Sequence, residues 1–177
     1  MERRSLTFLK LGILFIFFNF ELTLFNFNLE RVDLMPDFVG MLFLFTSIVS
    51  HDVQTETEKR LKPLLLLLAA DDFLHWILRF ENSLESLLSG VIFIYVIFVL
   101  MGEVVNRIRP EQSERAKHLN AARVGTVLFL TFHFLLSSYD NNILNGVLVV
   151  FFMFMLISLM LVVCRIRPCG GQSSTTF

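Results

Sequence analysis

The chain has 177 residues, of which 55% are hydrophobic, and its mean hydropathy is +0.68. Soluble domains of this size are usually about 45–50% apolar, so the composition argues against a soluble globular protein. The formal net charge of −1 argues against a nucleic-acid partner.

Six apolar segments follow one another along the chain, and together they predict an all-α membrane protein with six transmembrane helices. A helix needs about 20 apolar residues to cross about 30 Å of hydrocarbon. The segments cover residues 8–25, 34–50, 63–80, 84–105, 122–139 and 143–163. We expect residues 1–168 to form one domain and residues 169–177, rich in Gly, Ser and Thr, to form a disordered cytoplasmic tail.

The first segment has features of a signal peptide, because Arg3 and Arg4 precede its apolar run. It also contains Lys10 and lacks a small-residue cleavage site, so we expect it to remain as the first spanning helix.

The six helices are expected to pair as three helical hairpins. The second helix of each hairpin begins with a capping residue, which is Asp33, Asn82 or Asp140, and a glycine follows about two turns later. Two interpretations stay open, a threefold internal repeat or independent selection of good caps. The longer connections, residues 51–62 and 106–121, are expected to be solvated loops, and a short interfacial helix is the alternative for the second one.

The basic residues predict how the chain is oriented in the membrane. Only Arg31 and Arg79 fall on one side of the six-helix arrangement. The other 13 basic residues share the opposite side: Arg3, Arg4, Lys10, Lys59, Arg60, Lys62, Arg107, Arg109, Arg115, Lys117, Arg123, Arg165 and Arg167. Since Lys and Arg concentrate on the cytoplasmic side, we expect a plasma (inner) membrane protein with both termini in the cytoplasm.

The third helix carries the most distinctive polar group, formed by Asp71, Asp72 and His75. Spacings of three and four residues allow either carboxylate to reach the imidazole. A charge at a helix centre costs about 2.5–3.5 kcal/mol on insertion scales, so these residues should face protein or water. His133 in the fifth helix and Glu21 in the first are candidate partners. Three interpretations stay open: a proton relay or cation site, a polar network that fixes helix packing, or a tilted, partly re-entrant span.

Acidic residues gather on the side opposite the basic ones. An acidic mouth would concentrate cations, whereas carboxylates at these positions also cap helix N-termini. The residues are Glu30, Asp33, Asp37, Glu81, Glu85 and Asp140.

No enzyme motif is present, whether His-Glu-x-x-His, Gly-x-Ser-x-Gly or a phosphate-binding glycine loop. Cys164 and Cys169 are too few for a tetrahedral zinc site, and we expect neither metal nor cofactor. The sequence favours a non-enzymatic membrane protein that acts as a partner, sensor or immunity-type component. The alternative is a small carrier or proton- or cation-coupled permease that uses the Asp71, Asp72 and His75 cluster. The expected partners are the lipid bilayer and another membrane protein.

A short motif opens the second apolar segment, and it reads Asp33-Leu-Met-Pro36-Asp37-Phe38-Val39-Gly40. It resembles the signature Asp-x-x-Pro-Asp-Phe-[Ile/Val]-Gly of small uncharacterised integral membrane proteins of Firmicutes-type bacteria. There, as here, the signature follows a first span that ends in an Asn-rich sequence, although this chain has Met41 where the family often has Tyr. The resemblance covers about 35 of the 177 residues. It implies a bacterial plasma-membrane protein and supplies no activity.

Overall fold

The computed structural model describes residues 2–17, 21–22, 32–33, 37–78, 83–136, 154 and 157–167. Within these residues the chain is helical apart from one pair of two-residue strands, which confirms the predicted all-α fold class. The elements are α1 (Arg3–Phe17), β1 (Glu21–Leu22), β2 (Val32–Asp33), α2 (Asp37–Val49), α3 (Glu56–Leu78), α4 (Ser83–Ile108) and α5 (Ser113–Leu136). Residues 157–165 form a further helical segment.

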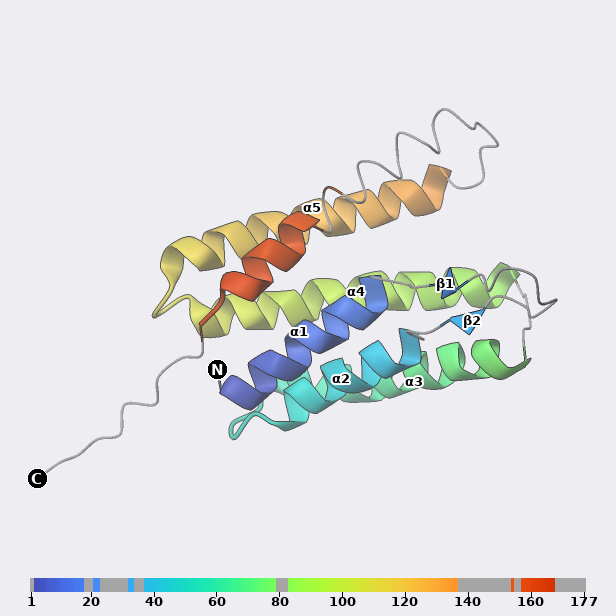
Figure 1. Cartoon of the computed structure of the whole chain (residues 1–177), viewed down its shortest axis with the longest axis horizontal. Helices are drawn as coiled ribbons and strands as arrows, with labels where there is room; N and C mark the ends of the chain where they lie inside the picture. Colours follow the sequence, from blue (N-terminus) through green and yellow to red (C-terminus); the bar gives the residue numbers. More distant parts are fainter. Residues whose placement is uncertain are drawn as a thin grey trace, which may run out of the picture.

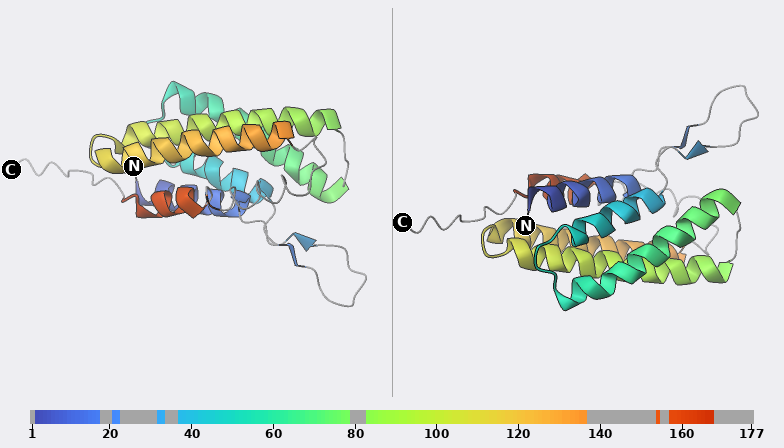
Figure 2. Two further views of the ribbon diagram at one scale, coloured as in Figure 1. Left: turned by 90° about the horizontal axis from the view of Figure 1, so that it is seen from above. Right: turned by 90° about the horizontal axis from the view of Figure 1, so that it is seen from below.

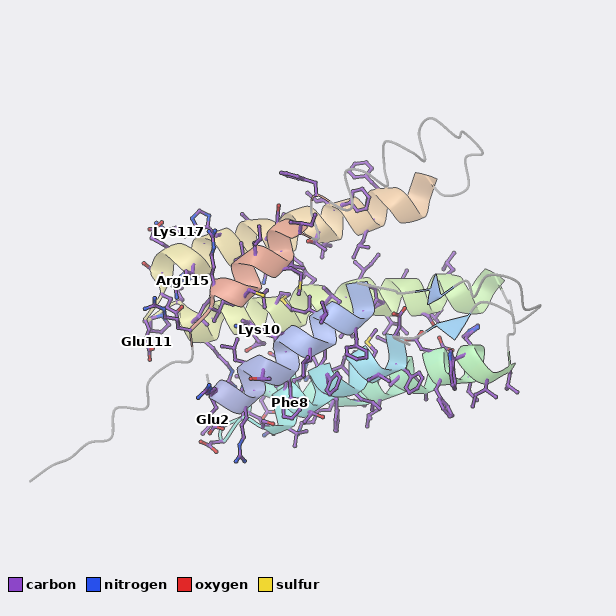
Figure 3. The ribbon with its side chains drawn as sticks, in the orientation of Figure 1. Glu2, Phe8, Lys10, Glu111, Arg115 and Lys117 are labelled. Atoms are coloured by element: carbon purple, nitrogen blue, oxygen red, sulfur yellow. The ribbon has the colours of Figure 1, made fainter. Side chains whose placement is uncertain are left out.

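Helices that are neighbours in the chain pack against each other and run in alternating directions, from α1 to α5 (Figure 1). The segment 157–165 returns to lie beside α1 (Figure 2). There the Lys10 ammonium donates a 3.1 Å hydrogen bond to the carbonyl of Cys164. The turns that join α2 to α3 and α4 to α5 lie at the same end of the molecule as Glu2 (Figures 1 and 3).

The helix α3 begins with a capping box. The backbone N–H of Glu58 donates to Thr55 Oγ1 at 3.1 Å, and the backbone N–H of Thr55 donates to Glu58 Oε2 at 2.9 Å. These two bonds satisfy donors that the first turn of a helix leaves free. The pattern Thr-x-x-Glu therefore sets the start of α3 seven residues before Pro63, which the helix contains.

Two glycines bring α1 and α2 close together. A methyl group at Gly12 would lie 2.6 Å from Leu44 Cδ2, and one at Gly40 would lie 2.5 Å from Ile16 Cγ1. Small residues on both helices allow the backbones to approach in this way. Around the contact, the side chains of Leu9 and Ile13 are fully buried.

The first helix is shorter than the predicted span, residues 8–25. It ends at Phe17, and Glu21 lies in β1, where it pairs antiparallel with Asp33. The prediction that Glu21 lies in a spanning helix is therefore wrong. Apolar and polar side chains alternate in the sequence of residues 18–24, and a period of two is typical of a strand. The mean hydropathy of the segment does not reveal this alternation. The strand pair lies apart from the helices (Figure 2).

The two charged connections, residues 51–62 and 106–121, are mostly helical, so the prediction that they form loops is wrong. The helix α3 already begins at Glu56, α4 continues to Ile108, and α5 begins at Ser113. Charged side chains three residues apart support these added turns, which an apolar-run criterion does not detect. The ion pairs are Glu56–Lys59 at 2.7 Å and Glu114–Lys117 at 2.8 Å.

Within the described residues, one helix is long and apolar enough to cross a membrane, and it covers Leu87–Ile108 of α4. The apolar helix α2 has 13 residues, which corresponds to a length of about 20 Å. Most of the predicted sixth span, residues 143–163, and the whole predicted tail, residues 169–177, lie outside the described residues.

Candidate functional site

A cavity of about 400 Å³ lies among the helices and is lined by several polar side chains. The helix α3 supplies Asp71, Asp72 and His75, α2 supplies Asp37, and α4 supplies Ser89. We call this space the acidic cavity. The three α3 residues were predicted to act together, and the structure brings them to one cavity. Asp37 and Ser89 join them only through the packing of α2 and α4 against α3.

Asp71 is the centre of the polar contacts in the acidic cavity. Its Oδ2 accepts a hydrogen bond from the hydroxyl of Ser89. Its Oδ1 lies 3.8 Å from His75 Nε2, one helical turn away. Their side chains are only 17% and 31% exposed, respectively, so the cavity shields both from bulk water. This arrangement offers carboxylate oxygens and an imidazole to a proton or a small cation.

In the part of the chain that the structure describes, no three His, Cys, Asp or Glu side chains converge closely enough to hold a metal ion.

One residue of the signature lines the acidic cavity, and two others make contacts close to it in sequence. Asp37 lines the cavity directly. The ring of Phe38 meets the ring of Phe73 edge-on at 5.2 Å between centroids and lies 5.9 Å from Trp76. Gly40 makes the close contact between α2 and α1. Each of these three residues thus has a physical role, whereas Asp33 lies in β2 and Pro36 lies outside the described residues.

The two predicted partners of the cluster are not brought into the cavity by any described contact. His133 belongs to α5, but its side chain lies outside the described residues, as does that of Glu21. Leu130, three residues before His133, does line the cavity.

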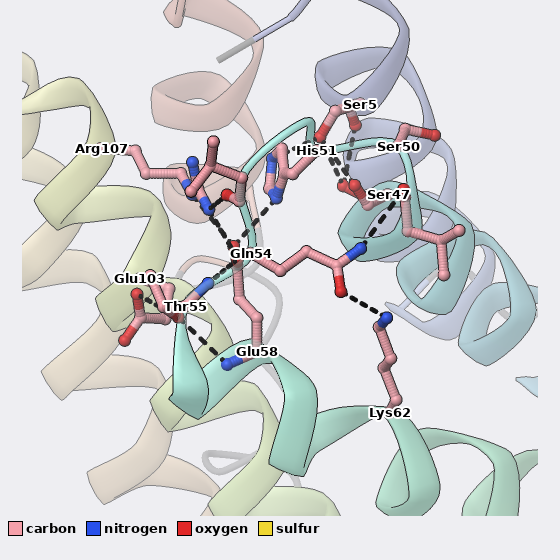
Figure 4. Close-up of polar contacts among 12 residues, drawn as sticks. Ser5, Ser47, Ser50, His51, Gln54, Thr55, Glu58, Lys62, Glu103 and Arg107 are labelled. Atoms are coloured by element: carbon pink, nitrogen blue, oxygen red, sulfur yellow. Dashed lines mark hydrogen bonds and ion pairs between the residues drawn. The ribbon is translucent and has the colours of Figure 1, made fainter.

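A second polar group, which we call the buried polar network, joins α1, α2, α3 and α4 (Figure 4). Ser5 Oγ lies 2.8 Å from His51 Nε2, and His51 Nδ1 lies 2.9 Å from Glu58 Oε1. Ser5 also donates to the carbonyl of Ser47 at 2.9 Å. Arg107 donates to Glu58 through Nη2 at 2.6 Å and through Nε at 3.0 Å.

Burial and charge shift the pKa values of two groups in the buried polar network. Burial, together with the positive charge of Arg107, holds the pKa of His51 below its ordinary value, against the opposing effect of Glu58. Burial also raises the pKa of Glu58, but hydrogen bonds from Arg107 and the Thr55 backbone and the nearby positive charge outweigh it. The pKa of Glu58 consequently lies below its ordinary value.

Ser5, His51 and Glu58 have the connectivity of a Ser-His-carboxylate triad. The exposed fraction of Ser5 is 0% and that of Glu58 is 1%, so a substrate does not reach the hydroxyl in this conformation. The hydroxyl is also shared with Ser47. These buried hydrogen bonds and ion pairs therefore hold the helices together.

No family model, curated protein or solved structure matches this chain.

Sequence reasoning missed the buried polar network because two of its residues, His51 and Glu58, were assigned to a solvated connection. One signal was available, since Thr55 and Glu58 form a capping-box pattern that predicts a helix start inside this connection. No local pattern indicates that Ser5 or Arg107 is near, because they are 46 residues before and 56 residues after His51.

Proposed function

We propose that this chain is a non-enzymatic, multi-pass integral membrane protein whose acidic cavity binds a proton or a small cation, as in a small coupled permease. One observation carries the proposal. Three carboxylates and an imidazole, on Asp37, Asp71, Asp72 and His75, line one cavity between helices. Intramembrane ionisable residues commonly mark proton or ion pathways.

The outer surface of the helices supports a lipid environment. Large apolar side chains are exposed along α2 to α5, although soluble monomers rarely leave extended apolar patches uncovered. Examples that are at least half exposed are Leu67, Leu74, Ile77, Leu78, Leu87, Leu88, Val91, Tyr95, Leu128 and Phe132. Hydrocarbon would cover these side chains at no hydrophobic cost.

The proposed topology has six spans in three hairpins, with both termini in the cytoplasm. It rests on the sequence positions of the basic residues and on the positive-inside rule. The short α2 would require local thinning of the bilayer or tilting of its neighbours. Reporter fusions after Phe177 and within the 26–31 segment test this topology, because a reporter active only in the cytoplasm should work at the first site alone.

In the proposed mechanism, Asp71 and Asp72 supply the negative charge of the acidic cavity. His75 and Ser89 both contact the Asp71 carboxylate and so influence how strongly it attracts a cation. Two adjacent carboxylates in a shielded cavity repel each other when both are ionised. Binding of a proton or a small cation relieves this repulsion. A protonated His75 would pair with Asp71 and would thereby weaken the attraction of the cavity for a cation, so the two ligands compete.

The experiment is a flux measurement on the purified full chain in liposomes that contain a pH-sensitive dye. An imposed Na⁺ or K⁺ gradient should move protons in the wild-type protein. The Asp71→Asn/Asp72→Asn variant should lose this flux while keeping its thermal unfolding midpoint, since the amide oxygen introduced at position 71 can still accept from Ser89. Glu56→Gln is the matched control, because Glu56 lies on the same helix with 79% of its side chain exposed.

Two results would contradict the permease proposal. One is the absence of flux in the wild-type protein, combined with a large loss of stability in the double variant. That result assigns the cluster to helix packing and favours the role of partner or sensor. The other is equal flux in wild-type protein and double variant, which would remove these carboxylates from the pathway.

A further inference from the structure

A second cavity, of about 320 Å³, lies between the end of α4 and the beginning of α5. Its polar lining consists of Asn106 from α4, Arg109 from the turn directly after α4, and Lys117, Asn120 and Arg123 from α5. We call it the basic cavity. Spacings of three residues (106 and 109; 117, 120 and 123) place these side chains on the facing sides of the two helices. It is separate from the acidic cavity, and none of its lining residues is shared with it.

Arg123 is held in place by α4. Its guanidinium carbon lies 4.2 Å above the centre of the Phe98 ring, a cation–π contact. The guanidinium also lies directly over Gly102, where an added methyl group would collide with Nη1. The Nε of Arg123 is buried and has no hydrogen-bond partner among the described residues. A buried donor without an acceptor is costly, so this group favours the arrival of an anion.

Two of the three positive charges around the basic cavity have no counter-charge. Its lining carries three cationic side chains and no acidic one. The ammonium of Lys117 pairs with Glu114 at 2.8 Å. Glu103 of α4 instead accepts a 3.2 Å hydrogen bond from Thr55, the residue before α3. Arg109 and Arg123 have no carboxylate partner within the described part of the chain.

We propose that the basic cavity binds a phosphate group, with Arg109 and Arg123 as its charged ligands and Asn106 and Asn120 as neutral donors. Arginine is suited to this task because its planar fork donates two hydrogen bonds to one phosphate. The volume is sufficient for one phosphate with its bridging water. Two sources share this chemistry, the headgroup of an anionic lipid and free phosphate in solution. Basic pockets between membrane helices typically hold lipid headgroups.

The test uses the full chain purified in a neutral detergent, with two separate probes. Phosphatidylglycerol added to the micelles reports on a lipid source, and inorganic phosphate added without lipid reports on a soluble source. Native mass spectrometry counts bound molecules, and thermal unfolding follows their effect on stability. We expect Arg109→Gln/Arg123→Gln to weaken binding of the effective probe by at least about tenfold, the size expected for lost charged hydrogen bonds.

Two further variants separate the site from general charge effects and from misfolding. Arg60→Gln removes an exposed arginine of α3 outside the cavity and should bind like the wild-type protein. Gly102→Ala keeps every charge but displaces the Arg123 guanidinium, so it should also weaken binding while the protein still folds.

Each outcome decides a point. Binding of phosphatidylglycerol alone supports the site and assigns it to lipid, and binding of both probes supports it and assigns it to phosphate in general. Equal loss in Arg60→Gln, or no binding of either probe to the wild-type protein, overturns the proposal. The proposal is also overturned if Gly102→Ala and Arg109→Gln/Arg123→Gln, measured as separate variants, both bind the probes as the wild-type protein does.

Discussion

Arg107 of α4 and Glu58 of α3 form a two-point ion pair in the interior, with hydrogen bonds of 2.6 and 3.0 Å. The side chain of Glu58 is 1% exposed, and that of Arg107 is 22% exposed. Glu58 therefore depends on Arg107, the Thr55 backbone and His51 for all of its polar contacts. This pair connects the capping of α3 to the packing of α4.

Removal of Arg107 alone should strongly destabilise the fold. Arg107→Met leaves the Glu58 carboxylate buried with fewer partners, which typically costs about 3–5 kcal/mol. The measurement is chemical or thermal unfolding in detergent, followed by circular dichroism. Lys59→Met is the control, because it breaks a solvent-exposed ion pair with Glu56, and such pairs contribute little to stability. Similar losses in the two variants would contradict a special role for the buried pair.

The free energy of unfolding should fall as the solution is acidified. The pKa of His51 in the folded protein lies below its ordinary value of 6.5, so the unfolded chain takes up this proton first. This contribution to stability is complete above pH 6.5 and declines as the pH drops toward the folded pKa. Glu58, with a pKa below its ordinary 4.5, adds a second loss at lower pH, as its folded pKa is approached.

Unfolding midpoints measured from about pH 8 down to about pH 4 test this dependence. In His51→Gln the decline that starts near pH 6.5 should disappear, and the Glu58 decline should remain. His118→Gln, at an exposed position of α5, should keep the wild-type profile. A His51→Gln profile that matches the wild type would remove His51 as the cause.

Enlargement of Gly40 should separate α1 from α2. Its added methyl would lie 2.5 Å from Ile16 Cγ1 and 3.0 Å from the carbonyl oxygen of Gly12, which is backbone. Gly40→Ala should therefore cost about 1–3 kcal/mol, as overpacked cores do. Ala70→Val, at an exposed position of α3, should change stability by at most about 0.5 kcal/mol. A neutral Gly40→Ala would show that the two helices separate without cost.

Trp76 is the single tryptophan of the chain, and its fluorescence reports on the surroundings of α3. It is 48% exposed and contacts Phe38 and Phe73. In liposomes, brominated lipids should quench its fluorescence at least about twofold more than aqueous iodide, since tryptophan favours the membrane interface. Phe38→Leu should shift the emission maximum. Stronger quenching by iodide would place Trp76 in water and contradict the proposed lipid contact.

The candidate sites differ in how far the sequence predicts them. Asp71 and His75 could be paired from sequence because a helical spacing of four residues brings side chains together wherever the helix lies. The prediction for Glu21 was wrong because it followed hydrophobicity and overlooked the alternation of residues 18–24. Arg123 was counted only as one of many basic residues. Its approach to Phe98 and Gly102 depends on how α4 and α5 cross.

The sequence by itself determined the helical class, the segregation of charge and the spacing within each helix. These features follow from local periodicity and from the cost of burying peptide groups without hydrogen bonds. Only the tertiary structure decided that Asp37 and Ser89 join Asp71, that Arg107 reaches Glu58, and that two arginines face one cavity between α4 and α5. The reason is physical. Contacts between distant segments depend on which helix faces pack together and how closely. Gly12, Gly40 and Gly102 have no side chain, so the neighbouring helix can approach their backbone closely.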